Sequence, residues 1–216
     1  MSFIDKIKFG NLNFKDKEIS LKQDELSERL MDLGIYDRLL EMPPPSNSSD
    51  ETIRELNSCV KMIGDASEAV IQFCQAAEDD YCQVFIDYLK RRGINDLTKE
   101  DMQNVIDQLD PLTFRLKEHY NRPRPYQLAY YYDLDLHVPI KTTGVDNPAY
   151  PSGHALEGYV MAELLAERYP EYSVGLLKLG KNIGLSRMIV GVHYKSDYDF
   201  GVYIGKQIIE NDLVRL

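Results

Sequence analysis

Apolar residues recur along most of this chain at the spacing that places them on one face of an α-helix. Residues 20–41 form the first such stretch. The side chains expected to face inward there are Leu26, Leu30, Leu33 and Leu40. Residues 51–92 have the pattern of two or three helices. The segment 43–50, which is rich in Pro and Ser, predicts a break between these stretches.

The helical pattern continues through the second half of the chain. Thr98, with Asp101 three residues later, is typical of a helix start, and this helix is expected to end at Leu109. Pro111 is expected to begin the following helix. Three further helices are expected at residues 154–169, 173–191 and 196–211. Because no convincing pair of strands is evident, the sequence predicts an all-α fold, a single-domain helical bundle.

The size and charge of the chain limit the number of domains and the kinds of partner that we expect. With 216 residues we expect an N-terminal arm and helix over residues 1–45 and one helical domain over residues 46–216. We interpret residues 1–20 as an arm or as a contact in a homo-oligomer. The net charge of −10 argues against a nucleic-acid partner. No apolar run approaches the length of about 18 residues that indicates a membrane-spanning helix, so no membrane span is expected.

Two features favour a cytoplasmic location. The first residues of the chain are interrupted by charges too often for a secretory signal. The three cysteines, Cys59, Cys74 and Cys82, lack the spacing of a metal site. We interpret them as buried thiols in a reducing compartment.

Residues 126–150 are the least regular part of the chain. We expect a long loop that crosses near the mouth of a site and contributes to its selectivity. The loop contains Asp133, Asp135 and His137, which have the side chains of metal ligands. Carboxylates with one histidine on a loop are far more often surface groups, so no metal is expected there.

A pattern near the C-terminus, Ser-Arg-x5-His-x3-Asp, combines a cation, an imidazole and a carboxylate. On an unbroken helix Arg187 and His193 would lie about 240° apart, so we expect Gly191 to end the helix between them. Ser196 is expected to cap the next helix, with Asp197 in its first turn. Asp197 can then accept a hydrogen bond from one ring nitrogen of His193. The other nitrogen is left bare and more basic, as a nucleophilic or general-base histidine requires.

Two earlier stretches have the residue types of an anion site. Ser152 is a good N-cap for the helix that follows it, and Gly153 allows an anion to approach the backbone amides at the positive end of that helix. His154 is then beside the anion and can transfer a proton. Lys117 and Arg124 add two permanent cations, with Pro125 stiffening the segment that carries the arginine.

Three motifs follow one another along the chain: Lys-x6-Arg-Pro, Pro-Ser-Gly-His and Ser-Arg-x5-His-x3-Asp. Together they resemble the three-part signature of the type-2 phosphatidic acid phosphatase superfamily. The resemblance covers roughly residues 39–205 and is closest to the bacterial class A non-specific acid phosphatases. Three motifs in order with intact spacing make a specific signal. The resemblance implies a helical bundle and hydrolysis of phosphomonoesters of small phosphorylated substrates through a phosphohistidine. It implies no metal and no cofactor, although vanadate or phosphate can occupy the site.

The resemblance also assigns a role to each matching residue. His193 attacks phosphorus, Asp197 holds its ring, and His154 protonates the leaving oxygen. The residues that bind the phosphoryl oxygens are Lys117, Arg124, Ser152, Gly153 and Arg187. Two other residues of the first motif fall outside its matching positions. We interpret His119 as structural and Arg122 as an outside candidate for substrate contact.

The motifs are also compatible with other functions. A vanadate-dependent haloperoxidase uses the same cradle, because vanadate mimics five-coordinate phosphate, but those enzymes are generally much longer chains. A non-catalytic phosphate-binding scaffold is a second alternative, and the absence of membrane spans argues against a lipid phosphatase. The natural substrate is open among nucleotides, sugar phosphates and small diphosphates. A bell-shaped pH profile on the acidic-to-neutral side is expected, because one histidine must be protonated while the other is not.

Overall fold

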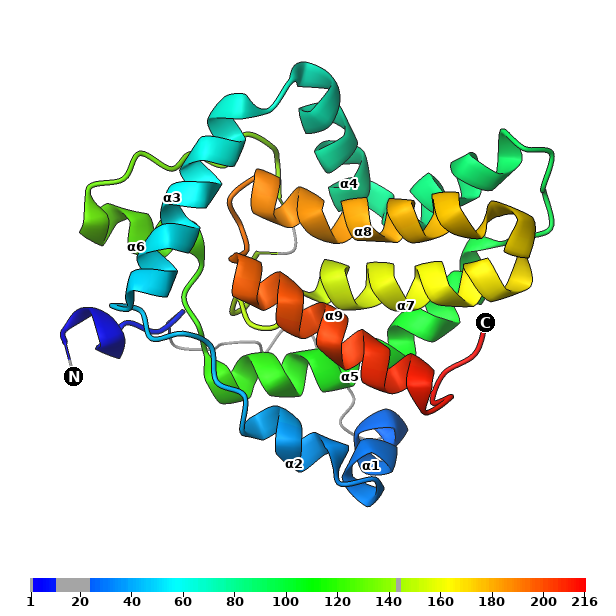
Figure 1. The fold of residues 1–216 in the computed structure, drawn as a ribbon, viewed down its shortest axis with the longest axis horizontal. Helices are drawn as coiled ribbons and strands as arrows, with labels where there is room; N and C mark the ends of the chain where they lie inside the picture. Colours follow the sequence, from blue (N-terminus) through cyan, green and yellow to red (C-terminus); the bar gives the residue numbers. More distant parts are fainter. Residues whose placement is uncertain (1, 11–23, 143–144) are drawn as a thin grey trace.

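The computed structural model describes residues 2–10, 24–142 and 145–216. This part of the chain is mostly α-helical and contains no β-strand (Figure 1). Its α-helices are α1 (Glu25–Asp32), α2 (Ile35–Leu40), α3 (Asp50–Asp65), α4 (Glu68–Lys90), α5 (Lys99–Tyr120), α6 (Pro125–Ala129), α7 (Gly153–Arg168), α8 (Ser173–Ile189) and α9 (Lys195–Glu210). Its short 3-10 helices are η1 (Ile4–Lys6), η3 (Tyr130–Tyr132) and η4 (Pro170–Tyr172). The predicted all-α class is confirmed.

The centre of the bundle is formed by α7 and α8, which lie side by side, with α9 packed against α7 (Figure 1). Gly158 of α7 and Gly180 of α8 meet where these helices touch. A Cβ on Gly158 would lie 2.9 Å from the Gly180 carbonyl oxygen, so only glycine allows this approach. Helix α4 packs against α8, and α5 packs against α7 and α4. Fully buried side chains in this core include Leu89, Leu112, Leu156, Leu176 and Ile204.

Short-range signals in the sequence begin most of these helices. The side chains of Ser49, Ser67 and Ser152 each accept a hydrogen bond from a first-turn N–H of α3, α4 and α7, respectively. Thr98 and Asp101 form a capping box at the start of α5. The predicted helix starts at Thr98 and Ser152 are therefore confirmed. Residues 51–92, where two or three helices are expected, form α3 and α4, and α4 has a kink at Asp80.

Two predicted helix boundaries are wrong. Helix α5 is continuous, with Pro111 inside it, because its apolar face is buried on both sides of the proline and this packing outweighs the lost hydrogen bond. The stretch predicted at residues 20–41 is divided into α1 and α2 at Gly34, which has a φ of 63°. Leu33 precedes this break and is 49% exposed instead of facing inward. Residues 20–23 of that stretch lie outside the described residues.

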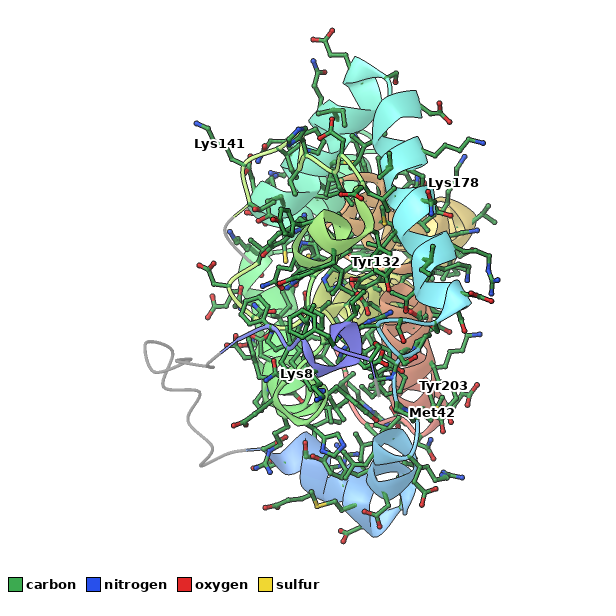
Figure 2. The ribbon with its side chains drawn as sticks, turned by 90° about the vertical axis from the view of Figure 1, so that its left-hand side faces the viewer. Lys8, Met42, Tyr132, Lys141, Lys178 and Tyr203 are labelled. Atoms are coloured by element: carbon green, nitrogen blue, oxygen red, sulfur yellow. The ribbon has the colours of Figure 1, made fainter. Side chains whose placement is uncertain are left out.

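The described part of the N-terminal segment packs against the body of the protein. The side chain of Asn47 donates hydrogen bonds to the carbonyls of Ile4 and Ile7 at 3.0 and 2.9 Å. The hydroxyl of Tyr132, labelled near the middle of the face in Figure 2, donates to the Asn47 carbonyl at 2.8 Å. The remainder of the predicted arm, residues 1 and 11–20, lies outside the described residues. The boundary between residues 45 and 46 stays a prediction.

The segment predicted as one long loop begins with two short helices, α6 and η3. Asp135 and His137 are exposed and pair with each other at 2.7 Å. Residues 143–144 lie outside the described residues. Across the described ranges, no helix combines the length and the apolar character that crossing a membrane requires.

Candidate active site

Backbone hydrogen bonds join the three motifs at the start of α7. The N–H of Ala149, just before the second motif, donates to the Arg122 carbonyl in the first at 3.0 Å. The N–H of Ser152 donates to the Asp197 carbonyl in the third at 3.1 Å. The first and third motifs are joined by the Arg124 guanidinium, whose Nη1 donates to the Val192 carbonyl at 2.9 Å. These contacts bring all eight predicted residues into one region of the fold.

His193 lies in the connector between α8 and α9, where Gly191 has a φ of 72°. Its Nδ1 lies 3.0 Å from Oδ2 of Asp197, which also accepts the Tyr194 N–H at 2.9 Å. The N-cap of α9 is therefore Tyr194, and Asp197 sits in the first turn. The prediction that Ser196 caps this helix is wrong, because the helix begins two residues earlier and its first turn is stabilised by the Asp197 carboxylate.

Asp197 is held from behind by Arg122, which is fully buried. Nη1 of Arg122 lies 2.6 Å from Oδ1 of Asp197 and 2.7 Å from the Ser196 hydroxyl, and Nη2 lies 3.3 Å from a Glu55 carboxylate oxygen. The guanidinium stacks 3.9 Å from the ring centre of Tyr194. Burial raises the pKa of Asp197 to about 6, and Arg122 opposes that shift. Arg122 thus supports the ionised form of Asp197 and lies behind it, which does not fit the substrate contact considered from the sequence.

The second nitrogen of His193 is not bare, which corrects the prediction. Nε2 lies 2.8 Å from Nη1 of Arg124. Because Arg124 can only donate and Asp197 accepts at the other nitrogen, the two bonds require the neutral tautomer with hydrogen on Nδ1. Arg124 is further held by Asn147, whose backbone and side-chain oxygens each accept a hydrogen bond at 2.9 Å. Its guanidinium therefore faces the nitrogen expected to react.

The two other cations come from different helices. Lys117, in the last turn of α5, donates to the Pro148 carbonyl at 2.6 Å. Arg187, in the last turn of α8, pairs with Glu78 of α4. Burial and the neighbouring Arg124 hold the pKa of Lys117 well below its usual range, whereas Asp197 and Glu157 oppose this shift. Its charge depends on the anions that face it.

Ser152, Gly153 and His154 begin α7 as predicted, and the Ser152 hydroxyl accepts the Ala155 N–H at 3.4 Å. His154 packs edge-on against Tyr81, with the ring centres 5.3 Å apart. Its Nε2 is buried and has no hydrogen-bond partner among the described residues. Gly153 and His154 are the partly exposed members of the eight, whereas the other six are buried. The cluster therefore comes nearest to solvent at Gly153 and His154.

Electrostatics indicate that the two imidazoles share one cluster of cations. Burial lowers the pKa of His193 well below the usual histidine value, and Arg124, Lys117, Arg187 and His154 lower it further. Burial and Arg187 likewise lower the pKa of His154. Both rings are thus neutral at neutral pH, and an anion bound among the cations would favour their protonated forms.

Comparisons with known proteins support this geometry. Residues 105–209, which include all eight, match the PAP2 superfamily. A non-specific acid phosphatase of Salmonella typhimurium is 30% identical over 176 residues, which cover 76% of this chain and 68% of that protein. The chain belongs to this acid phosphatase family of the PAP2 superfamily. An acid phosphatase of Zymomonas mobilis is 27% identical over 74% of this chain and 62% of its own length.

Solved structures show the PAP2 fold at greater evolutionary distance. A bacterial vanadium-dependent iodoperoxidase has a TM-score of 0.60 and 19% identity, covering 81% of this chain and 53% of its own. A transmembrane PAP2-type phosphatidylglycerolphosphate phosphatase from Bacillus subtilis has a TM-score of 0.52 and 15% identity, covering 91% and 100%. At these identities the likeness supports the helical fold of this PAP2 protein and not a choice between the two chemistries.

A surface groove of this PAP2 protein lies away from the eight residues. It has a volume of about 910 Å³ between α3, the end of α8 and the start of α9, and none of the eight predicted residues lines it. Cys59 lines the groove with its side chain buried, and Cys74 and Cys82 are also buried free thiols, as predicted. No group of three metal-ligand side chains is found in the ranges that the structure describes.

Sequence reasoning missed the acidic residues around the PAP2 site. Glu55 holds Arg122 and Ser196, and Glu78 pairs with Arg187, but both carboxylates are distant in sequence and lie in ordinary helical patterns. Glu157 is buried in α7 on the His154 side. Glu157 did leave a signal, because it is a charged residue three positions after His154 within an apolar stretch.

Proposed function

We propose that the protein is a metal-independent phosphatase that hydrolyses phosphomonoesters through a phosphohistidine on His193. The observation that carries this proposal is the buried His193–Asp197 pair, whose second imidazole nitrogen faces Arg124. A phosphoryl group bound there can accept the Arg124 hydrogen bond and present phosphorus to Nε2. A nucleophilic histidine needs this orientation and a carboxylate that stabilises its developing positive charge.

In the first step, Nε2 of His193 forms a bond to phosphorus and the bond from phosphorus to the leaving oxygen breaks. His154 gives its proton to that oxygen, so the alcohol leaves neutral. The charge on the equatorial oxygens is balanced by Lys117, Arg124 and Arg187, together with donors at the start of α7. In the second step, water attacks the phosphohistidine and His154 accepts its proton, which releases phosphate and restores neutral His193.

The charge of the substrate supports this division of roles. His154 must carry a proton to act as the acid, although burial and the cations lower its pKa in the free protein. A bound phosphoryl dianion favours the imidazolium of His154. Nε2 of His193 faces the Arg124 donor, so this nitrogen stays unprotonated for attack on phosphorus. The acidic limb of the pH profile then reflects protonation of His193, and the alkaline limb reflects loss of the proton from His154.

The test is turnover of p-nitrophenyl phosphate by His193→Ala, with His119→Ala as the control. His119 is an exposed histidine on α5, so its replacement should leave turnover unchanged. His193→Ala should abolish both turnover and the acid-labile label left on the protein by a radiolabelled phosphoryl donor. His154→Ala should retain labelling with an activated aryl leaving group but lose about 10²–10⁴-fold in turnover of alkyl esters. Full turnover by His193→Ala would contradict the proposal.

Two ligands give independent checks. Orthovanadate is expected to inhibit competitively, because its five-coordinate form resembles the transition state and can bond to Nε2 of His193. EDTA is expected to leave turnover unchanged, since three basic side chains take the part that a metal ion plays in other phosphoryl-transfer sites. Loss of activity in EDTA that returns with a divalent metal would count against the mechanism.

A further inference from the structure

The proposed phosphoryl site has a carboxyl group at its edge. Glu157 lies one turn after Gly153 on α7 and is only 7% exposed. A Cβ placed on Gly153 would stand 3.0 Å from Oε1 of Glu157, so this oxygen lies beside the first residue of the helix. Gly153 is where the helix amides are proposed to receive the phosphoryl group. A carboxylate so close to a bound dianion, away from water, is strongly unfavourable.

Charged and titratable groups of α4, α5, α7 and α8 surround Glu157. Helix α4 contributes Tyr81, which is hydrogen-bonded to the carboxyl group, and Cys82. Helix α5 contributes Asp110 and Lys117, and α8 contributes Arg187. His154 lies one turn before Glu157 on α7 itself, packed against the same Tyr81. Glu157 therefore sits between one like charge and the two cations that are proposed to hold the phosphoryl oxygens.

We infer that Glu157 is a proton-coupled counter-ion of the phosphoryl site. In the free protein above neutral pH its carboxylate balances the charge of Lys117 and Arg187. When a phosphoryl dianion binds, the dianion takes over this balance and Glu157 takes up a proton from solvent. The inference rests on the proposed function, because it takes the start of α7 as the phosphoryl site.

The direction of the pH effect follows from the surroundings of Glu157. Burial, with Asp110 next, raises the pKa of Glu157 to about 7 in the free protein. A bound dianion raises it further. Below about pH 6 Glu157 is already protonated, so it adds no pH dependence to binding. Above about pH 7 the binding of each dianion adds one proton at Glu157, and this contribution lowers the affinity by up to about tenfold per pH unit.

Sulfate is a suitable probe, because it stays a dianion between acidic and alkaline pH and cannot turn over. The direct readout is the infrared difference spectrum between sulfate-bound and free protein at pH 8. The wild type should gain the carbonyl band of a protonated carboxylic acid, with the small shift in deuterated water that identifies an exchangeable proton. Glu157→Gln, which keeps the shape of the side chain, should lack this band. The matched control is Glu167→Gln on the exposed part of the same helix, which should keep it.

A second variant covers the case in which Glu157→Gln does not fold. Asp110→Asn removes the neighbouring like charge, so Glu157 in the free protein should ionise at lower pH, and the midpoint of its carboxyl band should move down. An unchanged midpoint, or a sulfate-induced carboxyl band that persists in Glu157→Gln, would overturn the inference. If the wild type binds sulfate without gaining the carboxyl band, the inference about Glu157 is also overturned. The phosphohistidine mechanism is unaffected by that result, because His193→Ala and the labelling experiment test the mechanism separately. Failure of the wild type to bind sulfate at any pH would reject the anion site at the start of α7 and with it this inference.

Discussion

Replacing Arg122 by methionine removes one charge from the centre of the site while keeping most of the side-chain volume. In the wild type this guanidinium contacts both Asp197 and Glu55, and its side chain is 1% exposed. Methionine leaves two buried carboxyl groups without their cation. Breaking a buried ion pair by removing one partner typically costs about 3–5 kcal/mol, so we expect a loss of this size from the free energy of unfolding.

The loss should depend on pH with a defined sign. Burial already raises the pKa of Asp197 to about 6, and Arg122 is the main group that opposes it. Without Arg122 the pKa of Asp197 rises further above its unfolded value. An acid whose folded pKa is raised costs stability progressively as pH rises above the unfolded pKa. The destabilisation should therefore be larger at pH 7 than at pH 5.

The assay is urea unfolding followed by circular dichroism at both pH values. The matched control is Arg215→Met, which removes an arginine whose side chain is 78% exposed and paired with Asp212, and it should cost no more than about 1 kcal/mol. Glu55→Gln combined with Arg122→Met should cost less than the sum of the single variants, because the unpaired Glu55 charge is gone. The turnover number of Arg122→Met should also fall at neutral pH, since a protonated Asp197 cannot orient His193. If Arg122→Met lowers the free energy of unfolding at pH 7 by no more than the control does, Arg122 does not stabilise the ionised form of Asp197 as proposed.

Two further predictions concern stability. Glu157→Gln should be about 3 kcal/mol more stable than the wild type at pH 8 and nearly unchanged at pH 4. The reason is that the raised pKa of Glu157, about 7, destabilises the folded state only as pH rises above the unfolded pKa of 4.5. Urea unfolding at the two pH values measures this, and equal stability of variant and wild type at pH 8 would contradict it. Gly201→Ala should cost about 1–3 kcal/mol, because the new Cβ would lie 2.6 Å from the Ser152 carbonyl oxygen and push α9 away from α7. Gly64→Ala on α3 has nothing within 4 Å of the new Cβ and serves as the control, which should be neutral or stabilising.

Features that depend on neighbours in sequence were predictable for this protein. A serine before an apolar helical run caps α7, and a glycine between Arg187 and His193 ends α8, because both effects act within one helical turn. The eight candidate residues were recognisable because the three motifs keep their spacing. Helix boundaries that depend on packing were not predictable. Pro111 stays inside α5 because the bundle buries the residues on both sides of it.

The amino-acid sequence by itself determined the all-α fold class, the family resemblance and which residues are candidates for chemistry. Only the tertiary structure decided which charges face one another. Glu55 is 67 residues from Arg122 in the chain, and their contact exists only where α3 meets the segment before α6. The same holds for Glu78 with Arg187 and for Glu157 with Asp110. The strength of an electrostatic interaction depends on distance in space and on the exclusion of water, and both are properties of the packed bundle that no local pattern records.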